Sequence, residues 1–159
     1  MSETFDSIVI GAGQAGQAGP GMAARLAASG ERVALIERDQ MGGTCVNTGC
    51  TPTKTLVASA HAAWLAREGE RYGIMTGPVT VDAVRVRARK DAVVQASRGS
   101  VTRWMENTAG ITVIHGHARF TGPHTVAVDD RQLQAARIFV NVGAKATVPP
   151  VPGSRRFPI

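Results

Sequence analysis

Two cysteines at positions 45 and 50 are the side chains in this sequence best suited to redox chemistry. In a regular helix, Cys45 and Cys50 would point about 140° apart, at about 100° per residue. A disulfide needs Cα atoms within roughly 7 Å, so the chain between them must turn tightly, and Gly49 permits this. Pro52 suits the first turn of a following helix, which places Cys50 at a helix N-terminus where a thiolate is stabilised. We therefore interpret Cys45 and Cys50 as a redox-active pair.

A structural disulfide and a metal site are the alternatives for these cysteines. The segment 1–6 is polar and acidic, and the apolar run 8–10 is too short for a signal peptide, so we expect a cytoplasmic protein, where structural disulfides are rare. A zinc site needs about four ligands. His115 and His117 would have to complete it, but on a predicted strand they accompany ordinary hairpin residues, and the sequence has no Cys-x-x-Cys pair. We predict no metal site.

A glycine-rich segment after an apolar stretch predicts a dinucleotide-binding site. Gly11, Gly13 and Gly16 have the Gly-x-Gly-x-x-Gly spacing, and they follow a short apolar strand at 7–10 and precede a helix. Glycines let the backbone approach a pyrophosphate at the N-terminus of that helix. Glu37 closes the next strand, where a carboxylate can accept hydrogen bonds from a ribose diol.

The third glycine of this loop has two candidates, because Gln-Ala-Gly is repeated at 14–16 and 17–19. Counted forward from Gly11, Gly16 is at the position expected of the third glycine. Counted back from Gly30, where the helical pattern stops, Gly19 is at that position. The acid also lies further from the loop than the usual spacing of roughly 20 residues. Pro20 is tolerated only near a helix start, which favours an enlarged loop and a late helix.

The remaining pattern predicts an α/β, Rossmann-like domain, with a parallel sheet, helices and a small antiparallel hairpin region. The expected strands are 7–10, 32–36, 111–115, 118–120, 125–128 and 138–143, and the expected helices are 22–30, 54–67 and about 82–107. Asp129-Asp130 is expected to form a turn, and a proline-rich stretch at 149–153 breaks regular structure.

Composition excludes several classes of protein. The 159 residues fit one domain, and 43% of them are hydrophobic, which is enough for a core. The net charge is +6, but the arginines are spread out and have no interleaved aromatics, so we expect a solvated surface and no nucleic-acid binding. No apolar stretch approaches the length of a membrane span.

These motifs together resemble the class I pyridine nucleotide–disulfide oxidoreductases, the family of dihydrolipoamide dehydrogenase, glutathione reductase and mercuric reductase. The resemblance lies in 8–16, Glu37, 42–54 and 141–143, in that order. The sequence of 42–54 is most similar to the mercuric-reductase-like branch. The resemblance implies that FAD is bound, that NAD(P)H reduces it, and that electrons pass to the cysteines. It also implies that Cys50 is the sulfur beside the flavin and Cys45 the interchange thiol.

The resemblance also implies which residues contact the cofactor, and which substrate and assembly to expect. The implied cofactor-binding residues are Gly11, Gly13, Gly16, Gly19, Glu37, Arg38, Gly43, Thr44, Lys54, Ala118 and Gly143. The implied substrate is a small-molecule disulfide or a metal ion. The implied assembly is a homodimer, expected only for a full-length parent enzyme.

The sequence departs from the family pattern in what it lacks. It has no second Gly-x-Gly-x-x-Gly after the proline-rich stretch, and no counterpart of the family's C-terminal interface domain. We therefore expect 1–148 to be the first segment of a FAD-binding domain and 149–159 a linker toward an absent NAD(P)-binding domain. On this interpretation the chain is an N-terminal fragment that is inactive alone. The alternative is a non-catalytic module that binds a dinucleotide.

Overall fold

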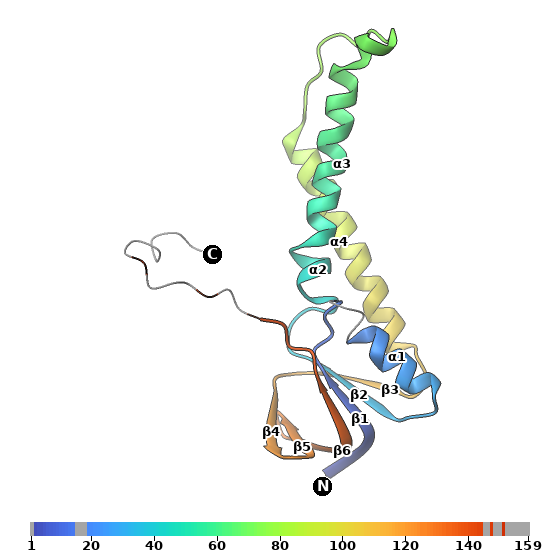
Figure 1. Cartoon of the computed structure of the whole chain (residues 1–159), viewed down its shortest axis with the longest axis vertical. Coiled ribbons are helices and arrows are strands. Elements are labelled where there is room, and N and C mark those ends of the chain that lie inside the picture. Colours follow the sequence, from blue (N-terminus) through green and yellow to red (C-terminus); the bar gives the residue numbers. More distant parts are fainter. Residues whose placement is uncertain (1, 15–18, 145–146, 148–150, 152–159) are drawn as a thin grey trace.

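The computed structural model describes residues 2–14, 19–144, 147 and 151. The strands are β1 (Ser2–Ile10), β2 (Val33–Glu37), β3 (Ile111–His115), β4 (Ala118–Gly122), β5 (Thr125–Val128) and β6 (Arg131–Val140). The helices are α1 (Pro20–Ala28), α2 (Gly43–Asn47), α3 (Cys50–Arg67) and α4 (Ala83–Glu106), and a 3-10 turn, η2 (Gly69–Tyr72), lies between α3 and α4. Figure 1 shows a sheet at one end and a long pair of helices extending from it.

The six strands form one mixed sheet in the order β3-β2-β1-β6-β5-β4. The four strands β3, β2, β1 and β6 are parallel, whereas β4, β5 and β6 pair antiparallel. Asp129 and Asp130 form the predicted turn between β5 and β6, and Asp129 has a φ of 49°. This arrangement confirms the predicted α/β class with a parallel sheet and a small antiparallel region.

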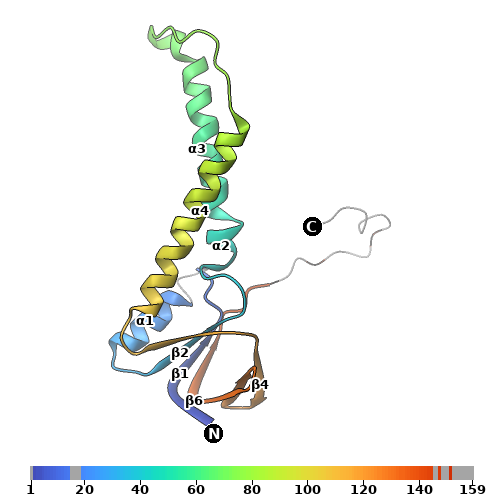
Figure 2. The same ribbon diagram turned by 180° about the vertical axis from the view of Figure 1, so that it is seen from behind.

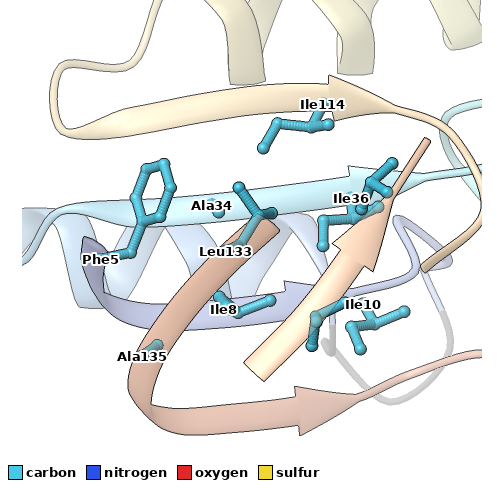
Figure 3. Close-up of a cluster of buried hydrophobic side chains, with 10 residues drawn as sticks. Phe5, Ile8, Ile10, Ala34, Ile36, Ile114, Leu133 and Ala135 are labelled. Carbon is cyan, nitrogen blue, oxygen red and sulfur yellow. The ribbon is translucent and has the colours of Figure 1, made fainter. Parts of the chain in front are cut away.

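Both faces of the parallel strands are buried, because successive side chains alternate between two apolar clusters. Ile8 and Ile10 of β1 face one cluster together with Ile36 of β2 and Leu133 of β6. Figure 3 shows these side chains beneath the antiparallel strands, which cover this face. The opposite cluster contains Val9, Val33 and Leu35 of the sheet, packed against Ala23 of α1 and Met105 of α4.

Helices α3 and α4 pack against each other and form a long arm beyond the sheet, visible from both sides in Figures 1 and 2. Arg89 of α4 ties them together, because its Nη1 donates to the Thr55 carbonyl at 3.0 Å and to the Ser59 hydroxyl at 3.1 Å. The short α2 lies at the base of this arm. Within the described chain, no helix combines the length and the apolar character needed to cross a membrane.

The main differences from the sequence-based expectation concern β1, β6, α2 and α3. β1 begins at Ser2 and β6 at Arg131, because these two strands pair in parallel register from Ser2 and Gln132 to Ile10 and Val140. This pairing extends both strands into segments whose polar residues obscure the apolar pattern. Residues 43–47 form a short helix where only a glycine-rich loop was expected, and the following helix begins at Cys50.

We predict that Leu35→Ala lowers the free energy of unfolding by about 2–5 kcal/mol, because it empties space in a closed cluster between sheet and helices. Leu35 is 0% exposed. Leu56→Ala on α3 is the matched control, since Leu56 is 43% exposed and its truncation leaves no closed cavity. Urea unfolding followed by circular dichroism measures both variants. Equal losses of stability would contradict this placement of the core.

Candidate active site

A cleft with a volume of about 440 Å³ opens at the carboxyl ends of β1, β2 and β6. This volume lies within the range of roughly 300–1,000 Å³ that small-molecule sites occupy. Nine of the residues predicted from the sequence line it: Gly11, Gly13, Glu37, Arg38, Gly43, Thr44, Cys45, Ala118 and Gly143. The fold thus gathers segments from separate parts of the chain around one cavity.

The floor of the cleft is built by close backbone contacts that leave no room for side chains. Gly11 has a φ of +99°, and a Cβ atom on it would lie 2.2 Å from the Asn141 carbonyl oxygen. A Cβ atom on Gly43 would lie 2.7 Å from the Gly13 Cα atom. The Asn141 amide Nδ2 donates to the carbonyl oxygens of Gly11 and Gly13, both at 3.1 Å. These contacts hold the loop after β1 as an open backbone cradle, the shape that a pyrophosphate requires.

Gly19 occupies the packing position expected of the third glycine. It is the N-cap of α1 with a φ of +59°, and a Cβ on it would lie 2.7 Å from the Gly13 carbonyl oxygen and 2.8 Å from that of Gly11. Pro20 is the first residue of α1, as the late helix start predicted. Gly16 lies outside the described residues. Gly19 does not line the cleft and instead supports the loop from behind.

Glu37 ends β2 at the cleft, and its carboxylate holds the loop after β1. Its Oε2 accepts a hydrogen bond from the Ala12 backbone N–H at 2.8 Å, and its Oε1 accepts one from the Asp39 backbone N–H at 2.9 Å. Each carboxylate oxygen retains a second lone pair, so Glu37 can still accept hydrogen bonds from two hydroxyl groups. The sequence indicated the ligand-binding role of Glu37 but not its bond to the loop.

Residues 116–118 and 141–143 also line the cleft. The Gly116 N–H donates to the Glu37 carbonyl at 2.9 Å, which brings the segment after β3 against the end of β2. Gly116 has a φ of +150° and follows the end of β3, so His117 leaves the strand and lines the cleft. The expectation that His115 and His117 share a strand is therefore wrong. No described atom lies within 4 Å of the Cβ position of Gly143, which leaves this backbone open to the cavity.

Cys45 and Cys50 lie on either side of a tight reversal and are both reduced. The Thr44 carbonyl accepts from the N–H groups of Gly49 at 2.6 Å and Thr48 at 3.0 Å, which closes the turn between the cysteines. Cys45 lies in α2 and is half-buried; Cys50 is the first residue of α3 and is exposed.

Contact between the two sulfurs raises the pKa of the Cys45 thiol above its usual value. A hydrogen bond with the Cys50 side chain is the main cause, and burial and the charge of Cys50 act in the same direction. The Cys50 backbone N–H and the Lys54 ammonium oppose the shift. Cys45 therefore holds its proton more firmly than an isolated thiol does.

Three of the predicted residues that the structure describes lie outside the cleft wall: Gly19, Cys50 and Lys54. Cys50 and Lys54 are on the first turns of α3, and neither lines the cavity. Two asparagines were missed as loop supports: Asn141, and Asn47, which also lines the cleft. Both asparagines lie within segments that the sequence analysis had selected, 42–54 and 141–143. Their position in these segments is the feature of the sequence that could have identified them. Among the described residues, no group of three or more His, Cys, Asp or Glu side chains is placed to hold a metal ion.

The chain has a glycine cradle after the first strand of a parallel sheet, an acid at the end of the second, and two nearby cysteines, of which Cys45 lines the cleft. This combination is typical of a dinucleotide-binding domain that also carries a thiol pair. The chain belongs to the pyridine nucleotide-disulphide oxidoreductase family, whose sequence profile matches residues 5–158. This confirms the family indicated by the sequence motifs.

Relatives from three branches of the family are similar to this chain. A dihydrolipoyl dehydrogenase of Acholeplasma laidlawii is 32% identical over 96% of the chain and 45% of its own length. A mercuric reductase of Serratia marcescens is 38% identical over 90% of the chain and 33% of its own length. The probable oxidoreductase RclA of Escherichia coli K12 is 35% identical over 97% of the chain and 32% of its own length.

A solved structure of RclA has the same fold over this region. Its Cu(II) complex, described as an HOCl-induced flavoprotein disulfide reductase, superposes with a TM-score of 0.76 at 35% identity. The match covers 96% of this chain and 31% of that protein. The chain thus spans between about a third and a half of the length of these three relatives.

We predict that Gly11→Ala is more damaging than Gly30→Ala, although both glycines have similar positive φ values of +99° and +91°. Both variants carry left-handed backbone strain of about 1–2 kcal/mol. Only Gly11→Ala also places a Cβ against the Asn141 carbonyl, which adds about 1–3 kcal/mol. Urea unfolding and calorimetric titration with ADP measure the two effects. Equal stability and equal ADP affinity in the two variants would contradict the close-approach assignment.

We predict that Cys50→Ala lowers the pKa of Cys45, because it removes the hydrogen bond that is the main cause of the raised value. A raised pKa means less thiolate at a given pH, so the rate of iodoacetamide alkylation of Cys45 reaches its midpoint at a higher pH with Cys50 present. The midpoint should therefore move to lower pH in Cys50→Ala. Mass spectrometry of the alkylated peptide follows the reaction. If the pH midpoint of Cys45 alkylation stays unchanged or rises in Cys50→Ala, the contact between the two sulfurs is refuted.

Proposed function

We propose that this chain forms the FAD-binding part of an NAD(P)H-driven disulfide oxidoreductase in which Cys45 and Cys50 are the redox-active pair. The observation that carries the proposal is the junction of the two motifs. The Gly42 N–H donates to the Ala12 carbonyl at 2.9 Å, and Gly43 packs on Gly13. The segment that carries the cysteines is thereby attached to the dinucleotide loop, with Cys45 on the cleft wall.

The residues present fit a dinucleotide such as FAD. Gly11 and Gly13 offer a cradle that side chains would fill, and Glu37 offers free lone pairs at the end of the second strand. We assign the pyrophosphate to that cradle, with Gly19 supporting it, and the ribose to Glu37. We assign the remaining contacts to Arg38, Gly43, Thr44, Lys54, Ala118 and Gly143. Bound FAD, once reduced by NAD(P)H, would supply the two electrons that open a disulfide.

The two cysteines divide the chemistry between them. Two electrons break the S–S bond of the oxidised pair. Uptake of one proton then gives one sulfur as a thiol and leaves the other as a thiolate. The raised pKa of Cys45 makes it the thiol that retains the proton, which supports Cys50 as the thiolate that stays beside the flavin. Cys50 is the first residue of α3 and is exposed. Cys45 then acts as the interchange thiol toward substrate.

We propose a small-molecule disulfide or a thiophilic metal ion as the electron acceptor, because a vicinal dithiol suits both. The sequence of 42–54 favours the mercuric-reductase-like branch, whereas relatives of three branches match at 32–38% identity. We propose a cytoplasmic location and, for a longer enzyme containing this chain, a homodimer.

A non-catalytic dinucleotide-binding module is the second candidate, because the cradle is built entirely from residues of this chain. Adding FAD and then NAD(P)H to a longer polypeptide that contains this chain separates the two. Flavin that is retained and then bleached supports the oxidoreductase. Binding of ADP or FAD without any change in the oxidation state of the cysteines supports the module.

We predict unequal spectra for two serine variants of the FAD-loaded protein, formed from this chain or from a longer polypeptide that contains it. Cys45→Ser should keep the long-wavelength absorbance of a thiolate against flavin, since Cys50 remains. Cys50→Ser should lose it, and both variants should fail to turn over a disulfide. The opposite spectral pattern would exchange the two roles, and it would agree with the position of Cys45 on the cleft wall. Full turnover in both variants would remove the cysteines from the mechanism.

A further inference from the structure

The helix that carries Cys45 is too short to be stable by itself. α2 has five residues, its N-cap Gly42 is left-handed, and no side chain caps its first turn. Isolated helices below about 12 residues are marginal in water, so contacts from elsewhere must fix α2. Its one buried side chain is Val46. Its last residue, Asn47, provides the polar contacts.

The Asn47 side chain joins three parts of the site. Its Nδ2 donates to the Gly43 carbonyl at 2.8 Å and to the Met41 carbonyl at 3.1 Å, which closes the turn that contains Cys45. Its Oδ1 accepts a hydrogen bond from Arg98 Nε at 2.7 Å. The guanidinium contact fixes the direction of the amide, because rotation by 180° would place an NH₂ group against a cation.

Arg98 lies on the inward face of α4, which packs against the rest of the molecule. Val94 and Met105 are the buried residues of this helix, and Val101 packs on the same cluster as Met105. Together with Arg98 they follow the spacing of one helix face. Arg98 is thus the polar member of an otherwise apolar row, and its Nε donates to the amide two residues after Cys45.

We propose that Arg98 is a positioning residue for the dithiol: through Asn47 it holds α2 so that the Cys45 sulfur stays within bonding distance of Cys50. This inference rests on the proposed redox role of the two cysteines. Without Arg98, α2 of the reduced protein samples other positions. The effective concentration of one sulfur at the other then falls, and disulfide formation becomes less favourable.

The test is the equilibrium of the 159-residue chain with glutathione. Formation of the Cys45–Cys50 bond removes two electrons and two protons from the thiols and converts one oxidised glutathione into two glutathione thiols. Acid quenching, alkylation and mass spectrometry give the equilibrium constant. Arg98→Met should lower it by roughly three- to tenfold, the range of one net hydrogen bond. Arg98→Lys, which keeps a donor, should lie between the two.

Arg103→Met is the matched control, because Arg103 is on the same helix but exposed, with Ser100 as its hydrogen-bond partner at 3.5 Å. It should leave the equilibrium constant unchanged. A positioning role also predicts that the pH midpoint of Cys45 alkylation falls in Arg98→Met, because Cys45 then loses part of the contact with Cys50 that raises its pKa. Removal of a cation that acts directly on the thiolate would instead raise the midpoint. An unchanged constant in Arg98→Met, an equal loss in Arg103→Met, a lysine variant no better than methionine, or an alkylation midpoint that does not fall would each overturn the proposal.

Two further outcomes of this experiment can be distinguished from a failure of the Arg98 proposal. If the unsubstituted chain forms no disulfide at any glutathione ratio, the redox assignment of the cysteines fails, whatever the role of Arg98. If Arg98→Met does not fold by circular dichroism, Arg98→Lys is compared with Arg98→Gln. The lysine variant must then form the disulfide more readily, and equal constants would overturn the proposal.

Discussion

The backbones of Gly13 and Gly43 meet without a side chain between them, since a Cβ on Gly43 would lie 2.7 Å from the Gly13 Cα atom. One of these glycines belongs to the loop that forms the cradle and the other begins the helix of Cys45. A larger residue at position 43 would separate the two segments. The spacing between the loop and the cysteine segment therefore depends on this contact, together with the hydrogen bond from the Gly42 N–H to the Ala12 carbonyl.

The sheet sets where that contact forms. β1 and β2 are parallel neighbours, so the loop after Ile10 and the loop after Glu37 leave from the same edge. The Gly11 N–H donates to the Ile36 carbonyl at 2.7 Å, and the Asn141 N–H donates to the Ile10 carbonyl at 2.7 Å. Three strand ends are thus fixed to one another before any ligand binds. Burial on both faces keeps the strands from slipping.

The sequence was sufficient for the features that local pattern encodes. Apolar runs in β1 and β2, the glycine spacing and Glu37 predicted the parallel sheet and the cleft. The first half of β6 was missed because Gln132 and Gln134 are polar and their strand is completed by pairing with the distant N-terminus. α2 was missed because it is short and glycine-rich, and its Asn47 is held by Arg98, 51 residues further along. Elements that are stabilised by residues far away in the sequence are hard to predict from a local sequence pattern.

The pairing of the first strand with the last has a consequence for how the chain is made. β1 lies at the centre of the sheet, yet its neighbour β6 is paired with it from Ser2 and Gln132 onward. At ~5–20 residues per second, the ribosome needs ~7–26 s to synthesise the intervening ~130 residues. During that time β1 can pair with β2 but has an open apolar edge, which makes the nascent chain a substrate for chaperones and slows the closing step of folding.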